Sequence, residues 1–280
     1  MRNWIVFLLL SIIFLFSACT PAEDFNLATS TVKPLIPTQI PTITLVPLTE
    51  TPLPTKTSIP TFTPAVPTPK DSSTPVPALK LCSPLAEQSL DELSEIITDP
   101  YNPPPPGKDD RHHGTDFAYY RRKDRTTIAG EVIQAILPGK VIAVVLDRLP
   151  YGNMVVIETA GSELPYELSN KLGITPDESL YHLYAHFEQN PQVTLGQWVN
   201  CGQPLGVVGA TGYNIVNPHL HLETRLGPAE ANFSAGMAYY STAASEQERS
   251  NYELWRTSGA FRHFDPMTLF NWYLQDPIGD

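Results

Sequence analysis

The segment richest in information is Pro218-His219-Leu220-His221-Leu222-Glu223, where leucine alternates with histidine and then glutamate. On a β-strand, side chains at positions i and i+2 point to the same side. The alternation therefore predicts a strand that buries Leu220 and Leu222 and presents His219 and His221 together on the opposite face. Two imidazoles on one sheet face with an apolar back are well placed to bind a metal ion.

Two further histidine clusters lie upstream of this strand. The first is Arg111-His112-His113-Gly114-Thr115-Asp116-Phe117, and the second ends the run Leu180-Tyr181-His182-Leu183-Tyr184-Ala185-His186. The same alternation places His186 with Tyr184 and His182 on one strand face, opposite the residues between them. A carboxylate with two histidines and an open fourth position is the ligand set of a catalytic zinc site.

The rest of the domain is mostly strand-like segments separated by turns. Strand-forming apolar runs cover residues 132–137, 139–145, 153–158, 180–186 and 205–209. Pro-Gly and Tyr-Gly-Asn breaks between them are typical of turns. Helices are predicted for residues 89–97, which open on a serine cap, and for residues 267–274 after Asp265-Pro266. The chain is therefore expected to be mainly β, an antiparallel domain with short flanking helices.

In order and spacing, the histidine clusters resemble the motifs of the M23 peptidase family, the lysostaphin- and LytM-like zinc endopeptidases of bacterial cell walls. The family's His-x-Gly-x-Asp pattern stands at residues 112–116, its Tyr-x-His at 184–186 and its His-x-His at 219–221. The glycine-punctuated run 196–212 also resembles the family. The resemblance extends over residues 111–274 and implies the antiparallel β-sheet groove fold of the lysostaphin/LytM type.

Position by position, the resemblance implies that His112, Asp116 and His221 bind Zn²⁺ and that His186 and His219 are catalytic. Zinc with three protein ligands keeps a water molecule, lowers the pKa of that water and polarises the scissile carbonyl. The two catalytic histidines would accept the proton of the water or donate to the developing oxyanion, and which does which stays open. The implied function is zinc-dependent hydrolysis of peptide bonds in bacterial cell-wall peptidoglycan by an endopeptidase.

Three side chains are expected to line a substrate groove beside this site: Tyr184, His182 and Asn214. Asn214 belongs to the run between Gly212 and Pro218, where the chain departs from the family pattern. Residues 161–179 and 229–261 are longer than in minimal family members. Such insertions form substrate walls or block the groove, and the sequence leaves both alternatives open.

The N-terminus carries the signals of an exported protein. Arg2 precedes an apolar run, residues 4–16, which is too short for a stable membrane span and has the position of a signal-peptide core. The run ends in Phe16-Ser17-Ala18-Cys19, which resembles a bacterial lipobox. We expect residues 1–19 to be a lipoprotein signal peptide and Cys19 to be acylated, anchoring the protein at the outer face of the cell membrane. The alternative is an ordinary signal peptide cleaved near Ala18.

Residues 20–80 are rich in proline and threonine, and the 29 prolines of the chain are concentrated in its first third. Proline removes a backbone donor, so this segment is expected to be a disordered, extended linker before a domain at residues 81–280, with a core at 111–274. Cys82 and Cys201 remain once Cys19 is acylated. In an oxidising compartment they are expected to form a disulfide, the alternative being two buried thiols.

The charge distribution limits the partners of the chain. After Lys80, 25 acidic residues face 13 basic ones, whereas residues 20–80 are neutral. Neutralising phosphates requires a basic surface, so nucleic acid is excluded as a partner. The expected partners are peptidoglycan peptides and a membrane reached through the N-terminal lipid, and the protein is expected to be a monomer.

Two other functions are compatible with the same residues. One is a non-catalytic wall-binding regulator that activates a partner amidase. The other is a zinc peptidase that acts on a different substrate, such as a secreted protein. The bond that is cut cannot be derived from the sequence, because the groove walls that would select it lie in the unusual insertions.

Overall fold

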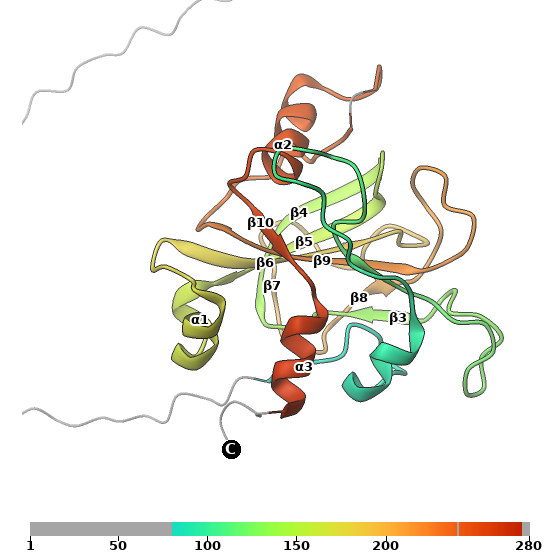
Figure 1. The fold of residues 1–280 in the computed structure, drawn as a ribbon. Helices are drawn as coiled ribbons and strands as arrows, with labels where there is room; N and C mark the ends of the chain where they lie inside the picture. Colours follow the sequence, from blue (N-terminus) through green and yellow to red (C-terminus); the bar gives the residue numbers. More distant parts are fainter. Residues whose placement is uncertain (1–79, 240, 276–280) are drawn as a thin grey trace, which may run out of the picture. The chain divides into compact units, whose positions relative to one another are not determined.

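The computed structural model describes residues 80–239 and 241–275 (Figure 1). The predicted signal peptide, Cys19 and the predicted linker up to residue 79 lie outside these residues. Within them, no helix combines the length and the hydropathy needed to cross a membrane.

Strands dominate the described part of the chain. They are β1 (Ile97–Asp99), β2 (Thr115–Phe117), β3 (Val132–Gln134), β4 (Gly139–Arg148), β5 (Gly152–Ala160), β6 (Glu178–Ala185), β7 (Trp198–Val199), β8 (Pro204–Val207), β9 (Leu220–Pro228) and β10 (Arg262–Phe264). The helices are the 3-10 helices η1 (Leu90–Ile96) and η2 (Gly161–Glu163), and the α-helices α1 (Tyr166–Leu172), α2 (Glu246–Arg256) and α3 (Met267–Gln275).

The main sheet has the strand order β1-β2-β9-β6-β5-β4-β7, and β10 pairs with β9 beside this path. A second, two-stranded sheet joins β3 to β8. All of these strand pairs are antiparallel. The predicted fold class, a mainly antiparallel β domain with short helices, is therefore confirmed.

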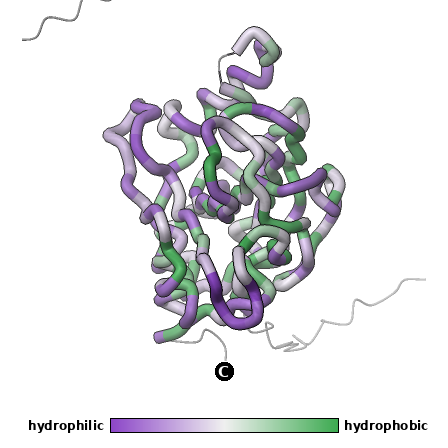
Figure 2. Tube along the Cα trace, turned by 90° about the vertical axis from the view of Figure 1, so that its right-hand side faces the viewer, coloured by the Kyte–Doolittle hydropathy of each residue, from purple (hydrophilic) through white to green (hydrophobic). Residues whose placement is uncertain are grey.

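Both faces of the main sheet are covered, which explains why its central strands β5, β6 and β9 are buried at almost every position. One face packs on a first core cluster that includes Leu85, Leu93, Ile133, Tyr184 and Phe270. The other face packs on a second core cluster that includes Met154, Leu183, Phe233, Trp255 and Phe261. In Figure 1, α3 lies below the sheet and α2 above it. Figure 2 shows hydrophobic residues along inner strands and hydrophilic residues on many outer turns.

Several element boundaries differ from those expected from the sequence. The predicted strand 132–137 stops at Gln134, and beyond it the chain leaves the β3–β8 pairing: the Ile136 carbonyl accepts instead from the Cys82 N–H at 2.9 Å. β4 continues to Arg148, three residues beyond the apolar run that predicted it. The predicted helix 89–97 is the 3-10 helix η1, which Ser89 and Glu92 cap reciprocally.

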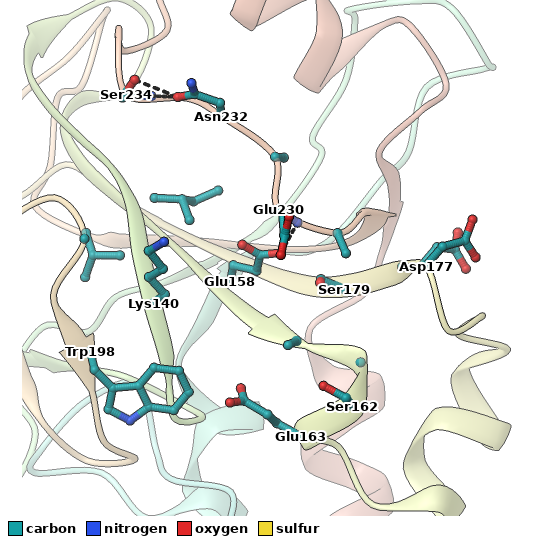
Figure 3. A pocket seen from close by; sticks show the side chains of 18 of the residues that line it. Lys140, Glu158, Ser162, Glu163, Asp177, Ser179, Trp198, Glu230, Asn232 and Ser234 are labelled. Atoms are coloured by element: carbon teal, nitrogen blue, oxygen red, sulfur yellow. Dashed lines mark hydrogen bonds between the residues drawn. The ribbon is translucent and has the colours of Figure 1, made fainter. Parts of the chain in front are cut away.

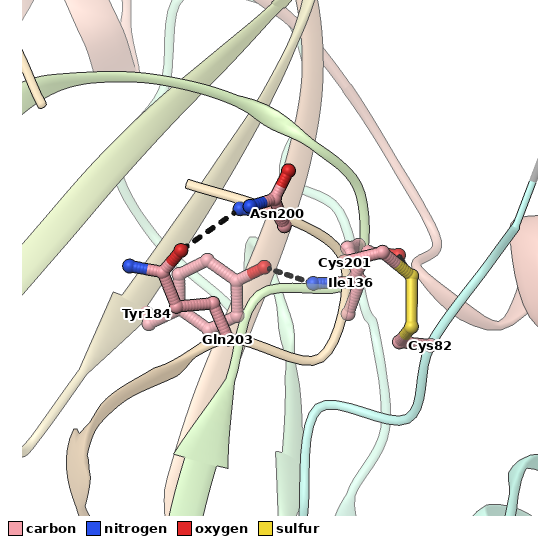
Figure 4. The surroundings of a disulfide bond; sticks show 6 residues. All are labelled: Cys82, Ile136, Tyr184, Asn200, Cys201 and Gln203. Atoms are coloured by element: carbon pink, nitrogen blue, oxygen red, sulfur yellow. Dashed lines mark hydrogen bonds between the residues drawn. A yellow bond between two sulfur atoms is a disulfide. The ribbon is translucent and has the colours of Figure 1, made fainter. Parts of the chain in front are cut away.

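The predicted disulfide between Cys82 and Cys201 is present and links residues 119 positions apart (Figure 4). The backbone around it is held to the core, since the Cys82 N–H donates to the Ile136 carbonyl at 2.9 Å. The Ile136 N–H in turn donates to the Tyr184 hydroxyl at 2.9 Å. The bridge therefore fastens the first described segment to the body of the domain.

The expectation that Tyr184 and His182 line a substrate groove is wrong. Both are fully buried, because β6 is a central strand and this face of it packs on the first core cluster. The hydroxyl of Tyr184 is engaged beside the disulfide, and His182 lies in register between Ile157 and Thr224. Neither ring nitrogen of His182 has a hydrogen-bond partner in the described residues.

Replacing His182 by leucine should make the protein less sensitive to acid. Burial lowers the pKa of this histidine from 6.5 to about 3, so below pH 6.5 the unfolded chain binds a proton that the folded chain excludes. The free energy of unfolding of the wild type therefore decreases as the pH is lowered. The difference in this free energy between His182→Leu and wild type should shift in favour of the variant by roughly 1 to 3 kcal/mol from pH 7.5 to pH 4.5. Urea titrations at both pH values measure it, and an advantage independent of pH would contradict the assignment.

Removing the disulfide should destabilise the domain strongly. In the chain-entropy description, a cross-link closing a loop of this length is worth about 4 to 5 kcal/mol. The Cys82→Ala/Cys201→Ala double variant is expected to lose that much free energy of unfolding in denaturant titrations. Reduced wild type is the matched control and should resemble the double variant, and equal stability of oxidised and reduced protein would contradict the prediction.

Candidate metal and catalytic site

Three side chains converge where β2 meets β9. Asp116 in β2 lies directly opposite His221 in β9, so both project from the same face of the sheet. Asp116 Oδ1 lies 2.8 Å from His221 Nδ1 and 3.1 Å from His112 Nε2. The two imidazole nitrogens are themselves 3.0 Å apart. One ion can contact all three atoms, since they lie within 4.8 Å of one another.

His112 reaches this point from the segment before β2. Its backbone forms a two-bond bridge with Asn102, and its ring Nδ1 lies 3.1 Å from the Pro100 carbonyl, to which it donates. That hydrogen bond leaves the lone pair of Nε2 for a metal. Gly114 is required between the two ligands of this segment, because an added Cβ would lie 2.8 Å from His221 Cε1.

The charges at the three atoms suit a divalent cation. Burial opposes ionisation of Asp116, but the contacts of its carboxyl with the His112 and His221 rings outweigh it and hold the pKa of Asp116 well below its usual range. Two nitrogens and one carboxylate oxygen, with room for a further ligand, fit a catalytic zinc site.

Glu223 orients the ring of His221 from behind. Its Oε1 accepts a hydrogen bond from His221 Nε2 at 3.1 Å, which directs Nδ1 toward Asp116. The fully buried carboxylate also accepts hydrogen bonds from the side chains of Tyr151, Arg225, Trp255 and Arg256. Burial opposes its ionisation, but the charge of Arg225 and the hydrogen bond from His221 outweigh this and hold the pKa of Glu223 well below its usual range.

The residues that hold Glu223 were not found from the sequence. Strand alternation could have indicated Arg225, because this residue continues the pattern of β9 on the face of His221 and Glu223. Arg225 also donates to Nδ1 of the buried His113 at 2.9 Å. Trp255 and Arg256 come from α2, inside the insertion 229–261, and no motif marks them.

His186 and His219 face the three candidate ligands from a second side. Nδ1 of His186 donates to the Thr211 carbonyl at 2.7 Å, and Nδ1 of His219 donates to the Asn217 carbonyl at 2.9 Å. Each Nε2 is thereby left for the site, and that of His219 lies 3.4 Å from Asp116 Oδ2. The two rings are neighbours, with centroids 4.6 Å apart. Burial, followed by the nearby histidines, lowers the pKa of His186 to about 3 and keeps the ring neutral.

The face predicted for His186 requires a correction. Simple alternation placed it with Tyr184 and His182, but β6 ends at Ala185 and His186 has a left-handed φ of 66°. The turn breaks the alternation and brings the ring of His186 to the face of His221, with centroids 5.8 Å apart. The strand rule holds only while the backbone stays extended.

A pocket of about 550 Å³ lies beside Asp116 and His219. Asn214, one of the predicted groove residues, lines it together with Tyr119 and Tyr120. The insertions do not close this pocket, since none of its lining residues belongs to residues 161–179 or 229–261. Both insertions instead contribute walls to a separate pocket at the other end of the strands (Figure 3).

Comparisons with known proteins agree with the motifs. Residues 110–233 match the model of peptidase family M23, and this range contains the five residues of the metal and catalytic sets. A mutant catalytic domain of the prophage-encoded M23 protein EnpA from Enterococcus faecalis is 26% identical, with a TM-score of 0.33, over 48% of this chain and 81% of that chain. The catalytic domain of the antimicrobial peptidase lysostaphin from Staphylococcus simulans is 24% identical, with a TM-score of 0.34, over 50% and 87% of the two chains.

A zinc containing peptidase from Vibrio cholerae is 29% identical, with a TM-score of 0.30, over 46% of this chain. The match covers 32% of that peptidase, so this chain corresponds to about a third of its length.

Asp116→Asn should weaken zinc binding by roughly a hundredfold or more, because even residues that only support metal ligands are worth about 10- to 100-fold. Isothermal titration of the metal-free protein with Zn²⁺ measures the change. Asp124→Asn removes another aspartate carboxylate, from the neighbouring loop, and should bind zinc like the wild type. Equal affinities for the two variants would exclude Asp116 as a ligand.

Proposed function

We propose that this chain is a zinc-dependent endopeptidase that hydrolyses peptide bonds in bacterial cell-wall peptidoglycan. The observation that carries the proposal is the convergence of His112 Nε2, Asp116 Oδ1 and His221 Nδ1, with His186 and His219 facing the same point. The match of residues 110–233 to a peptidase family supports the reaction class.

The residues around the candidate ligands can supply the proton transfers of hydrolysis. When bound, Zn²⁺ contributes Lewis acidity toward a water molecule and a carbonyl oxygen. His186 is neutral, with Nδ1 fixed by a carbonyl, so its Nε2 is suited to accept a proton from the attacking water. The Nδ1–H of His219 is held in the same way, and when its Nε2 also carries a proton, that second N–H is suited to donate to the oxygen that gains charge.

The pocket beside the site supports a peptide as the substrate. Aromatic side chains of Tyr119 and Tyr120 line one part, and the amide of Asn214 and the apolar Val216 line another. An extended peptide presents both backbone amides and side chains to such a surface.

The proposed location is outside the cell membrane. The disulfide between Cys82 and Cys201 fits an oxidising compartment. Acylation of Cys19 and an extended linker over residues 20–80 would hold a monomeric domain at the outer face of the membrane, within reach of the wall. The alternative is a wall-binding regulator of an amidase. In that function, none of the three candidate metal ligands and neither of the two candidate catalytic histidines would take part in hydrolysis.

His219→Ala should lower the rate of peptide hydrolysis by about 10²- to 10³-fold, the usual loss when a donor to the developing oxyanion is removed. Zinc-loaded protein is incubated with isolated walls, and mass spectrometry of released peptides gives the rate. His263→Gln is the matched control, because the ring of His263 contacts Tyr101 and His113 and none of the candidate ligands. Zinc binding by wild type without cleavage of any wall preparation would favour the regulator.

A further inference from the structure

A second pocket, of about 980 Å³, lies at the opposite end of the main sheet from the candidate metal ligands. Its floor includes the start of β4, the end of β5 and the start of β6. Residues 161–163 and 176–177 form one wall, and residues 229–234 contribute to another (Figure 3). The two insertions of this chain therefore build a pocket that the proposed reaction does not use.

An exposed indole stands at the edge of this pocket. Trp198 in the edge strand β7 is 48% exposed, which is unusual for a tryptophan without a ligand or partner. Figure 3 shows its ring near Lys140 and Glu163, at the side of the pocket. A flat aromatic face next to polar groups provides a stacking surface for a ligand that is apolar on one side only.

A buried carboxylate points to a ligand with hydrogen-bond donors. Glu158 is only 8% exposed, and its Oε1 accepts hydrogen bonds from the Tyr181 hydroxyl at 2.9 Å and the Glu230 N–H at 2.7 Å. Within residues 80–239 and 241–275, neither a hydrogen bond to Oε2 nor an ion pair with Glu158 is formed. Oε2 therefore stays open to the pocket, where it can accept a hydrogen bond from a donor group of a ligand.

The remaining charges determine which ligands fit. Lys140 lies in register with Glu158 on the neighbouring strand and makes no ion pair in the described part of the chain. Glu163, Asp177 and Glu230 also line the pocket, so acidic groups outnumber this one ammonium group. Anionic polymers are disfavoured by this balance. A neutral ligand that both donates and accepts hydrogen bonds is favoured.

We propose that this pocket binds a neutral saccharide, with one pyranose ring stacked on Trp198. Its hydroxyl groups would donate to Glu158 Oε2 and accept from Lys140. The inference rests on the proposed function in one respect: the natural saccharide would be the glycan strand of peptidoglycan, whose peptides the metal site would cut.

The position of the pocket agrees with a branched substrate. Cross-strand pairing puts Tyr181, which bonds Glu158, on the same sheet face as Ala185, which lies opposite His221. Ala185 lies six positions after Ser179 along β6, which corresponds to a distance of about 20 Å. An extended peptide of about six residues spans that length. A saccharide in the pocket would leave a peptide branch within reach of the candidate metal ligands.

Titration of the full chain with a tetramer of β-1,4-linked N-acetylglucosamine tests the proposal. Wild type should bind saturably by calorimetry, Trp198→Ala should bind at least tenfold more weakly, and Trp198→Phe should fall between them. Tyr166→Ala, which removes another exposed aromatic side chain, from α1, is the control and should bind like the wild type. Absence of saturable binding by wild type, or equal binding by Trp198→Ala, would overturn the proposal.

Two further arms separate this proposal from the catalytic one. In the first arm, trilysine replaces the saccharide in the titration. If the protein binds this cationic peptide and does not bind the saccharide, the saccharide assignment is overturned. The second arm compares the rates at which the protein hydrolyses intact walls and a glycan-free wall peptide. Trp198→Ala should lower the rate on intact walls relative to the rate on the free peptide. If zinc-loaded wild type cleaves neither substrate, the endopeptidase proposal fails, while the saccharide titration still decides the function of the pocket.

Discussion

The antiparallel pairing of β2 with β9 is the constraint on which the candidate site depends. This register sets Asp116 directly opposite His221 and brings a carboxylate oxygen within 2.8 Å of an imidazole nitrogen. The approach is possible because Gly114 leaves the space beside the His221 ring empty. A shift of one residue would turn Asp116 to the other face of the sheet and separate the three candidate ligands.

A buried charge network stabilises that arrangement from behind. Glu223 is fully buried between the His221 ring and the guanidinium groups of Arg225 and Arg256. Such a network is favourable only when each charge keeps its partners, and removing one partner of a buried pair typically costs about 3 to 5 kcal/mol. Because Arg256 and Trp255 belong to α2, the insertion 229–261 is an integral part of the fold and supports the His221 ring.

Sequence patterns predicted the elements that repeat regularly and missed what depends on turns and long-range packing. Alternation in β9 correctly placed Leu220 and Leu222 in the core, and cysteine counting correctly paired Cys82 with Cys201. The same alternation failed at His186, where a left-handed residue follows the strand, and it could not reveal that both faces of β6 are covered. The contribution of Arg256 could not be predicted either, because its contact with Glu223 joins distant segments without a local pattern.

X-ray absorption at the zinc edge tests the central claim most directly. In zinc-loaded full chain, the proposal predicts one zinc ion with two imidazole nitrogens at about 2.0 to 2.1 Å, one carboxylate oxygen and a further light-atom ligand. The imidazole contribution should fall from two to one in His221→Ala. A spectrum dominated by sulfur, or one that His221→Ala leaves unchanged, would contradict this description of the site.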